Sequence, residues 1–171
     1  MKFIIGMVSR IEQGKGQDTL IDAAAILRGK LSNFEVQIIG EGDKEFLIDL
    51  ISKYKLEKIV KLLGYKKNLY KIMSRFDVQV FPTRWPMEGF GIVALEAMML
   101  RVPLVASNFG PVPEVVGNAA VVVKPTPNDL ANGILKITNN SKLRQVLIRR
   151  GEIRVKKYFD IAKIAIKYEK A

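Results

Sequence analysis

Residues 82–96 have the sequence Pro82-Thr83-Arg84-Trp85-Pro86-Met87-Glu88-Gly89-Phe90-Gly91-Ile92-Val93-Ala94-Leu95-Glu96. The residues before it, Asp77 to Phe81, predict an apolar strand that ends at the proline, and those after it predict a helix that continues to about Leu100. Two glycines flank Phe90, so the backbone can come close to a ligand there. A helix that opens near Phe90 would present free N–H groups and its positive dipole end, which favour an anionic ligand.

Two carboxylates mark this segment. Glu88 lies just before the predicted helix and Glu96 lies inside it, eight positions later. The neighbours of Glu96 are apolar, so its carboxylate must find water, a hydrogen-bond donor or a ligand. Eight helical residues rise ~12 Å, which would let the pair hold two parts of one elongated ligand. The alternative is an ordinary helix with one solvated glutamate and one N-terminal glutamate favoured by the dipole.

The composition excludes several classes of chemistry. The 171 residues, 49% of them hydrophobic, suit one globular domain with a full core. The chain has no cysteine and no histidine, which excludes disulfides, thiolate metal sites, Ser-His catalysis and nearly all zinc chemistry. No apolar run has the length of a membrane span, and the N-terminus lacks the features of a signal peptide. A cytoplasmic protein is therefore expected.

The net charge of +11 is unevenly distributed, because +8 of it lies between Lys136 and the end of the chain. One interpretation is a solvated helical face. The other is attraction to a phosphorylated substrate, to nucleic acid or to anionic lipid, the last as a peripheral membrane contact. The sequence leaves both open.

A second segment suited to an anion lies near the N-terminus. Residues Phe3 to Val8 predict a buried strand and Thr19 to Leu27 predict a helix. The loop between them holds two glycines and the cations Arg10 and Lys15, an arrangement that can hold a phosphate or simply be solvated. It lacks the G-x4-G-K-[ST] spacing of a Walker A motif.

The rest of the chain continues to alternate strands with helices. Further strands are predicted at 36–39, 59–63, 102–107 and 119–123, further helices at 43–55, 69–74, 129–135, 142–157 and 161–170, and a loop at 108–114. This alternation predicts a doubly wound parallel α/β sheet in one domain over residues 1–171. Ligands of such sheets bind at the carboxyl ends of the strands, where both segments described above fall.

The residues Glu88-Gly89-Phe90-Gly91, followed by Glu96, resemble the E-x7-E signature of the group 1 family of retaining, nucleotide-sugar-dependent glycosyltransferases. From Val8 to Leu135 the motif order is similar to that of the C-terminal, donor-binding domain of their two-domain, Rossmann-like GT-B fold. The resemblance implies transfer of a hexosyl group from a UDP-, GDP- or ADP-sugar, without a metal or other cofactor. It also implies a separate N-terminal acceptor domain, absent from these residues, so the isolated chain is expected to be inactive.

The resemblance also implies roles for individual residues. Arg10 and Lys15 would neutralise the leaving diphosphate, Glu88 would hold the hydroxyls of the donor sugar, and Glu96 would accept the ribose hydroxyls. Arg10, Lys15 and Glu88 would form the catalytic group. Further donor contacts would come from Gly40, Gly42, Tyr65, Leu69, Gly89, Phe90, Gly91 and Ile92.

One departure and two alternatives accompany this reading. The family usually has glycine where this chain has Arg101, which leaves the end of the preceding helix uncertain. The pair Gly40 and Gly42 partly matches a dinucleotide fingerprint, but a dinucleotide-dependent oxidoreductase domain needs a full G-x-G-x-x-G after the first strand. The second alternative is a basic, non-catalytic module that binds nucleic acid or membrane through its C-terminal helices.

Overall fold

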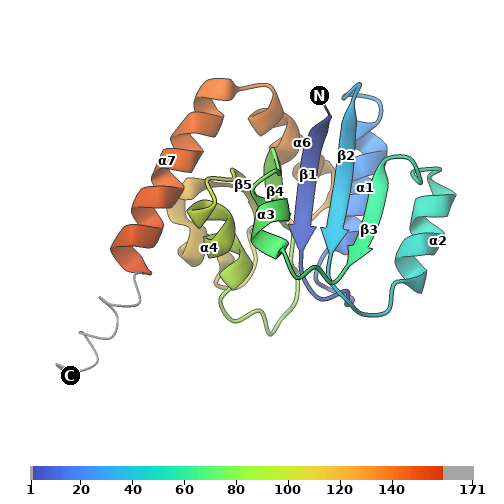
Figure 1. The fold of residues 1–171 in the computed structure, drawn as a ribbon, viewed down its shortest axis with the longest axis horizontal. Helices are drawn as coiled ribbons and strands as arrows, with labels where there is room; N and C mark the ends of the chain where they lie inside the picture. Colours follow the sequence, from blue (N-terminus) through green and yellow to red (C-terminus); the bar gives the residue numbers. More distant parts are fainter. Residues whose placement is uncertain (1, 160–171) are drawn as a thin grey trace.

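The computed structural model describes residues 2–159 and contains one six-stranded sheet whose strands are all parallel (Figure 1). The strands are β1 (Phe3–Val8), β2 (Phe34–Ile39), β3 (Val60–Gly64), β4 (Val78–Phe81), β5 (Leu104–Ser107) and β6 (Ala120–Val123). Their order is β3-β2-β1-β4-β5-β6. The order therefore reverses between β1 and β4, and in doubly wound sheets such a reversal opens a crevice at the carboxyl ends of the two strands.

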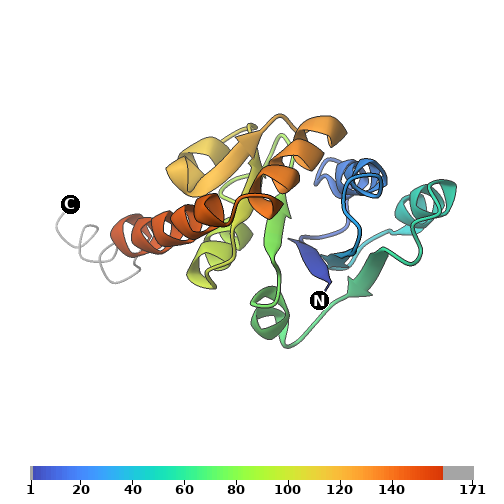
Figure 2. The same ribbon diagram turned by 90° about the horizontal axis from the view of Figure 1, so that it is seen from above.

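Seven α-helices and one short 3-10 helix are formed by the described residues. They are α1 (Gln17–Leu27), α2 (Glu45–Lys53), α3 (Leu69–Met73), α4 (Ile92–Met99), α5 (Val112–Val116), η1 (Gly117–Ala119), α6 (Pro127–Thr138) and α7 (Ser141–Tyr158). Figure 2 shows helices on both faces of the twisted sheet, as the alternation of strands and helices predicted. The helix predicted at 161–170 lies outside the described residues.

Side chains that alternate along the strands divide the core into two apolar clusters. Val105 on β5 belongs to the cluster that includes Leu20 on α1 and Leu130 on α6. Its neighbour Leu104 belongs to the other cluster, with Met98 on α4. Successive residues of a strand point to opposite faces, so a sheet covered by helices on both sides needs continuous apolar runs such as 102–106.

One predicted loop is partly wrong. Residues 108–114 were expected to be irregular, but α5 begins at Val112, inside that range. Pro111 and Pro113 argue against a helix only when they fall in its interior. Here they lie at the start of the helix, where backbone N–H groups have no intrahelical partner and a missing donor is tolerated.

The end of α4 accommodates Arg101 in an unusual conformation. Arg101 has φ 62°, in the left-handed region. Its N–H donates to the carbonyl of Met98 at 3.1 Å, and the N–H of Val102 donates to that of Ala97 at 2.9 Å. These bonds form a Schellman motif, in which glycine is the favoured residue at this position. The exposed Arg101 side chain pairs with Glu152 on α7 at 3.4 Å.

Beyond β1 and β4, the two following loops are tied to each other. The N–H of Arg84 donates to the carbonyl of Gly14 at 2.8 Å. The guanidinium of Arg84 binds both carboxylate oxygens of Asp18 and lies 2.6 Å from Oγ1 of Thr19. Gly16 has φ 94°, and a Cβ there would lie 2.3 Å from the carbonyl oxygen of Pro82. Loops 65 or more residues apart in sequence are thereby fixed in contact.

The first prediction concerns Arg101. R101G should raise the free energy of unfolding by about 0.5 kcal/mol. The left-handed conformation costs a residue with a Cβ roughly 1–2 kcal/mol, and glycine avoids this cost. Part of the gain is lost because glycine makes the unfolded chain more flexible and because the surface pair with Glu152 is removed. The matched control is R101A, which removes the pair with Glu152 but keeps the backbone strain. Urea unfolding of the three proteins measures the difference. R101G being less stable than R101A would contradict the assignment.

The second prediction concerns Asp18. Burial raises the pKa of Asp18, but hydrogen bonds from Arg84 and from the backbone outweigh it, so the pKa lies below its ordinary value of 3.8. A lowered folded pKa means that the stabilisation is present above pH 3.8 and is lost as the pH falls through the folded value. D18N should therefore cost about 1 kcal/mol at pH 7 and progressively less below pH 4.

Denaturant unfolding between pH 7 and pH 3 measures this difference, and the reciprocal variant R84Q should show the same pH dependence. If the loss in free energy of unfolding caused by D18N stayed constant across this pH range, the ion pair with Arg84 would not be its cause.

Candidate functional site

A hollow of about 300 Å³ opens where the sheet order reverses, at the carboxyl ends of β1 and β4. It is lined by Val8, Ser9, Arg10, Lys15, Phe81, Glu88, Gly91, Ile92, Val93 and Glu96. The four charged residues singled out in the sequence thus line one cavity, although they come from segments more than 70 positions apart. Larger hollows exist elsewhere, and the one beside α7, of about 460 Å³, contains none of these four residues.

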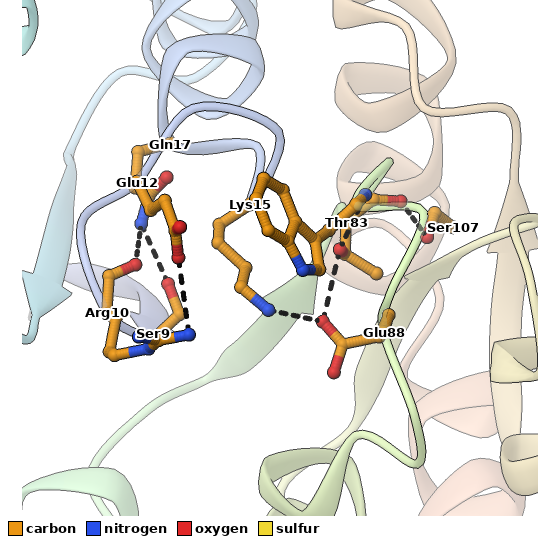
Figure 3. A network of polar contacts seen from close by, with 9 residues as sticks. Ser9, Arg10, Glu12, Lys15, Gln17, Thr83, Glu88 and Ser107 are labelled. Carbon is orange, nitrogen blue, oxygen red and sulfur yellow. Dashed lines mark hydrogen bonds and ion pairs between the residues drawn. The ribbon is translucent and has the colours of Figure 1, made fainter.

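Glu88 is held in this hollow by two partners. Its Oε2 lies 3.0 Å from Nζ of Lys15 and accepts a hydrogen bond from Oγ1 of Thr83 at 3.2 Å (Figure 3). The side chains of Lys15 and Glu88 are each 12% exposed, so water screens the ion pair little. Nζ of Lys15 also lies 5.5 Å from the centroid of the Trp85 ring, within the range of a cation–π interaction.

Thr83 connects Glu88 to the sheet. The Thr83 side chain is fully buried, and its Oγ1 also accepts a hydrogen bond from the N–H of Trp85 at 3.2 Å. Ser107, at the end of β5 and equally buried, donates to the Thr83 carbonyl at 2.6 Å. Neither Thr83 nor Ser107 was predicted from the sequence as a site residue. The available signal was that each of these hydroxyl residues lies at, or two positions beyond, the carboxyl end of a predicted strand, 102–107 for Ser107 and 77–81 for Thr83.

Arg10 differs from Lys15 in its surroundings. The Arg10 side chain is 76% exposed and lies 3.3 Å from Glu12. Its backbone is held by Gln17, a nearly fully buried side chain whose Nε2 donates to the Arg10 carbonyl at 2.6 Å and to Oγ of Ser9 at 2.8 Å (Figure 3). The loop backbone is therefore fixed, while the guanidinium of Arg10 reaches into solvent. Gln17 was also missed, because nothing in its sequence position distinguishes it from a solvated helix start.

Glu96 obtains a hydrogen-bond donor from another element. Oε1 of Glu96 accepts from the hydroxyl of Tyr70 on α3 at 2.9 Å. This hydrogen bond raises the pKa of Tyr70, because an ionised phenol could no longer donate it, and the negative charge of Glu96 raises that pKa further. The carboxylate on an apolar helix was expected to need such a partner, but Tyr70 itself was not identified.

The predicted geometry of the two glutamates is wrong in one respect. The helix opens at Ile92, with Gly91 at its N-cap in the left-handed conformation, φ 68°. Glu88 therefore lies in the loop before α4, and the two carboxylates are not separated by two helical turns. A Cβ at Gly91 would lie 2.7 Å from the Phe81 ring, which accounts for a glycine at this cap. No side chain of the described residues caps the first turn.

Gly40 and Gly42 lie against the first loop. A Cβ at Gly40 would lie 1.8 Å from the carbonyl oxygen of Ser9, and one at Gly42 would lie 2.0 Å from that of Ile11. The N–H of Ile11 donates to the Glu41 carbonyl at 2.7 Å, so this close approach lets the pairing of β1 and β2 continue into the loops. Both glycines line an adjoining hollow of about 320 Å³.

The other predicted contacts lie outside the hollow. Tyr65 is 66% exposed, while Leu69 is partly buried against the cluster beneath α4. Gly89 is exposed. The Phe90 ring packs edge to face on Phe159, with centroids 5.4 Å apart, and lines a different hollow. The structure therefore groups Arg10, Lys15, Glu88, Gly91, Ile92 and Glu96, but not these four.

Residues 2–159 contain neither a cluster of metal-binding side chains nor a helix suited to crossing a membrane. No group of three or more acidic side chains lies close enough together to hold a metal ion. Within the same range, no helix has both the length and the apolar character needed to cross a membrane.

Comparison with known proteins places the chain among glycosyltransferases. CapM, a capsular polysaccharide biosynthesis glycosyltransferase of Staphylococcus aureus, is 32% identical over 162 residues, which are 92% of this chain and 42% of CapM. A mutant of S. aureus TarM, solved in complex with fondaparinux, alpha-GlcNAc-glycerol and UDP, superposes with a TM-score of 0.88 at 26% identity. That match covers 99% of this chain and 35% of TarM.

A further solved structure is the C-terminal domain of the group 1 glycosyltransferase LpcC from Francisella tularensis. It has a TM-score of 0.82 at 25% identity and covers 93% of this chain and 87% of that domain. The chain spans less than half the length of the curated relatives that it matches.

These structural neighbours are GT-B glycosyltransferases, which confirms the predicted fold class and gives no support to the oxidoreductase alternative. The sequence model described as "Glycosyl transferases group 1" matches residues 1–154. The chain therefore belongs to the group 1 family of glycosyltransferases.

Proposed function

We propose that this chain is the nucleotide-sugar-binding domain of a retaining glycosyltransferase, which transfers a hexosyl group from a nucleoside-diphosphate sugar to an acceptor held by a second domain. The observation that carries the proposal is the convergence of Arg10, Lys15, Glu88 and Glu96 on one hollow beside the N-terminus of α4. Such a donor consists of a sugar, a diphosphate, a ribose and a nucleobase, and the hollow offers carboxylates for the hydroxyls and cations for the phosphates.

The diphosphate would lie between the first loop and the start of α4. Lys15 is positioned there by its contacts with Glu88 and Trp85. The exposed side chain of Arg10 would turn from solvent, where it contacts Glu12, toward the diphosphate. The first turn of α4 presents backbone N–H groups that no side chain in the described part of the chain caps. These groups would stabilise the charge that grows on the leaving diphosphate, which lowers the barrier because the charge is larger in the transition state.

The two carboxylates would bind hydroxyls at the two ends of the diphosphate. Oε2 of Glu88 is occupied by Lys15 and Thr83, so Oε1 is the oxygen that would accept from the transferred sugar. Glu96 would accept the ribose hydroxyls, with Tyr70 fixing its orientation. The nucleobase would extend toward Tyr65, Leu69 and the hollow lined by Gly40 and Gly42, on the β2–β3 side of the crevice.

The comparisons support this proposal in two ways. TarM was solved with UDP bound, which makes UDP the first nucleotide to test here, ahead of GDP and ADP. The C-terminal domain of LpcC folds as a separate unit of nearly the same extent, which supports a donor-binding domain that can be studied by itself. We expect the chain alone to bind the donor without turning it over, and the transfer to need no metal ion.

The third prediction tests the nucleotide end. Calorimetry should detect binding of at least one of UDP, GDP and ADP, and E96Q should weaken that binding roughly 10- to 100-fold, since hydrogen bonds to charged groups contribute about 1.5–3 kcal/mol. Thermal unfolding of E96Q should stay close to that of the parent protein, because Glu96 is only partly buried. The matched control is E57Q, at an exposed glutamate remote from the hollow.

Two results would count against the proposal. One is no detectable binding of any of the three nucleotides at millimolar concentration. The other is an E96Q affinity equal to that of E57Q.

The fourth prediction tests the sugar end through Thr83, a positioning residue. T83V keeps the buried shape but removes the hydroxyl that binds Glu88, so it should weaken binding of the UDP-sugar several-fold more than binding of UDP. T83S restores the hydroxyl, so the ratio of the affinities for the UDP-sugar and for UDP should return to that of the parent protein. Equal losses for UDP and UDP-sugar in T83V would show that Thr83 acts only through general stability.

A further inference from the structure

The outer face of α7 carries an uneven set of charges. This helix contains seven Lys or Arg residues and one acid, Glu152. Its inner face packs on α4, where Gly151 lies against Met98, and its Leu147 is buried in the cluster that includes Leu20 and Leu130. The exposed side chains recur every three or four positions, at Lys142, Val146, Arg149, Ile153 and Lys157. Residues with this spacing share one side of a helix, and we call these five the α7 outer face.

Apolar side chains lie in the middle of this basic face. Ile153 is 56% exposed and Val146 is 42% exposed, although both are aliphatic. Ile153 lines two hollows that also contain basic side chains, and Val146 lines the first of them. One, of about 460 Å³, is lined by Arg101, Arg149 and Arg150, and the other, of about 380 Å³, by Arg150, Lys157 and Tyr158. Glu152, the acid of this helix, already pairs with Arg101 at 3.4 Å.

We propose that the α7 outer face docks on a membrane that contains anionic phospholipids. Each cation near such a surface contributes about 1 kcal/mol of attraction, and the two hollows offer arginine groups for lipid phosphates. Ile153 and Val146 would lie at the boundary between headgroups and acyl chains, as the apolar side chains of interfacial helices do. A surface that binds nucleic acid would need the cations but would gain nothing from exposed aliphatic side chains between them.

The position of α7 is compatible with such docking. Figure 1 shows α7 along one end of the molecule, opposite α2, with its outer side uncovered by any other labelled element. The helix runs toward the carboxyl edge of the sheet, where Phe159 meets Phe90 in the loop that holds Glu88. A membrane along α7 would therefore lie beside the proposed donor site without covering it. This surface stands independently of the proposed function, because none of its residues lines the donor hollow.

The test is co-sedimentation of the full chain with vesicles of phosphatidylcholine, with and without about 30 mol% phosphatidylglycerol, an anionic lipid that makes the vesicle surface strongly negative. Binding should require the anionic lipid and weaken in 0.5 M salt, where screening is ~4 Å in range. The variant K142E/R149E/K157E should lose about a hundred-fold in partition, and I153S several-fold. The matched control, K30E/K53E/K58E, changes the net charge equally at exposed positions outside α7 and should lose far less.

Circular dichroism checks that each variant is folded. If the triple variant is not folded, R149Q replaces it, and its partition onto the anionic vesicles should fall roughly five-fold. Three results would overturn the proposal. These are equal losses in the two triple variants, equal binding to vesicles without phosphatidylglycerol, and retention on duplex DNA without any binding to vesicles.

Discussion

The contact between two loops at the carboxyl edge of the sheet is the constraint on which the site depends. β1 and β4 are neighbours in the sheet, so the loops that follow them leave the sheet side by side. The carbonyl of Pro82 lies where a Cβ of Gly16 would be, and Arg84 binds both the backbone of Gly14 and the side chain of Asp18. This packing lets Lys15 from one loop reach Glu88 from the other, across 73 positions of sequence.

The buried hydroxyls make this arrangement rigid rather than merely close. Glu88 is bound by Thr83, Thr83 is bound by Ser107, and both hydroxyl residues are completely buried at the ends of neighbouring strands β4 and β5. A buried hydroxyl without a partner is costly, so each of these hydrogen bonds fixes the next. The carboxylate is therefore positioned by the sheet itself, although it is carried by a loop.

Much of the fold followed from the sequence, because each part had a local signal. Apolar runs bounded by glycine or proline gave all six strands, and their parallel order followed from the alternation with helices. The small helix α5 was missed because Pro111 and Pro113 signal a loop by themselves, and only the surrounding packing shows that they begin a helix. At Arg101, tertiary structure imposes a left-handed cap that the residue does not favour.

The candidate site was predictable where charge or glycine marked it, and not where a neutral side chain acts through a partner. Arg10, Lys15, Glu88 and Glu96 stood out as charges in glycine-rich or apolar surroundings. Thr83, Ser107, Gln17 and Tyr70 did not, since their roles come from hydrogen bonds to residues distant in sequence. Gly40 and Gly42 were predicted as donor contacts, and in the structure their backbone lies against the first loop of the same chain.

For binding a diphosphate, the positions of the charges in the hollow matter more than their sum. Two cations and two carboxylates line it, so its side chains sum to no net charge. A diphosphate is attracted to such a site only if the cations lie nearer to it than the carboxylates do. The pairing of Lys15 with Oε2 of Glu88 neutralises one carboxylate, while Glu96 lies in α4 and accepts a hydrogen bond from Tyr70. The N-terminus of α4 adds partial positive charge between them, and the net charge of +11 draws anions toward the molecule as a whole.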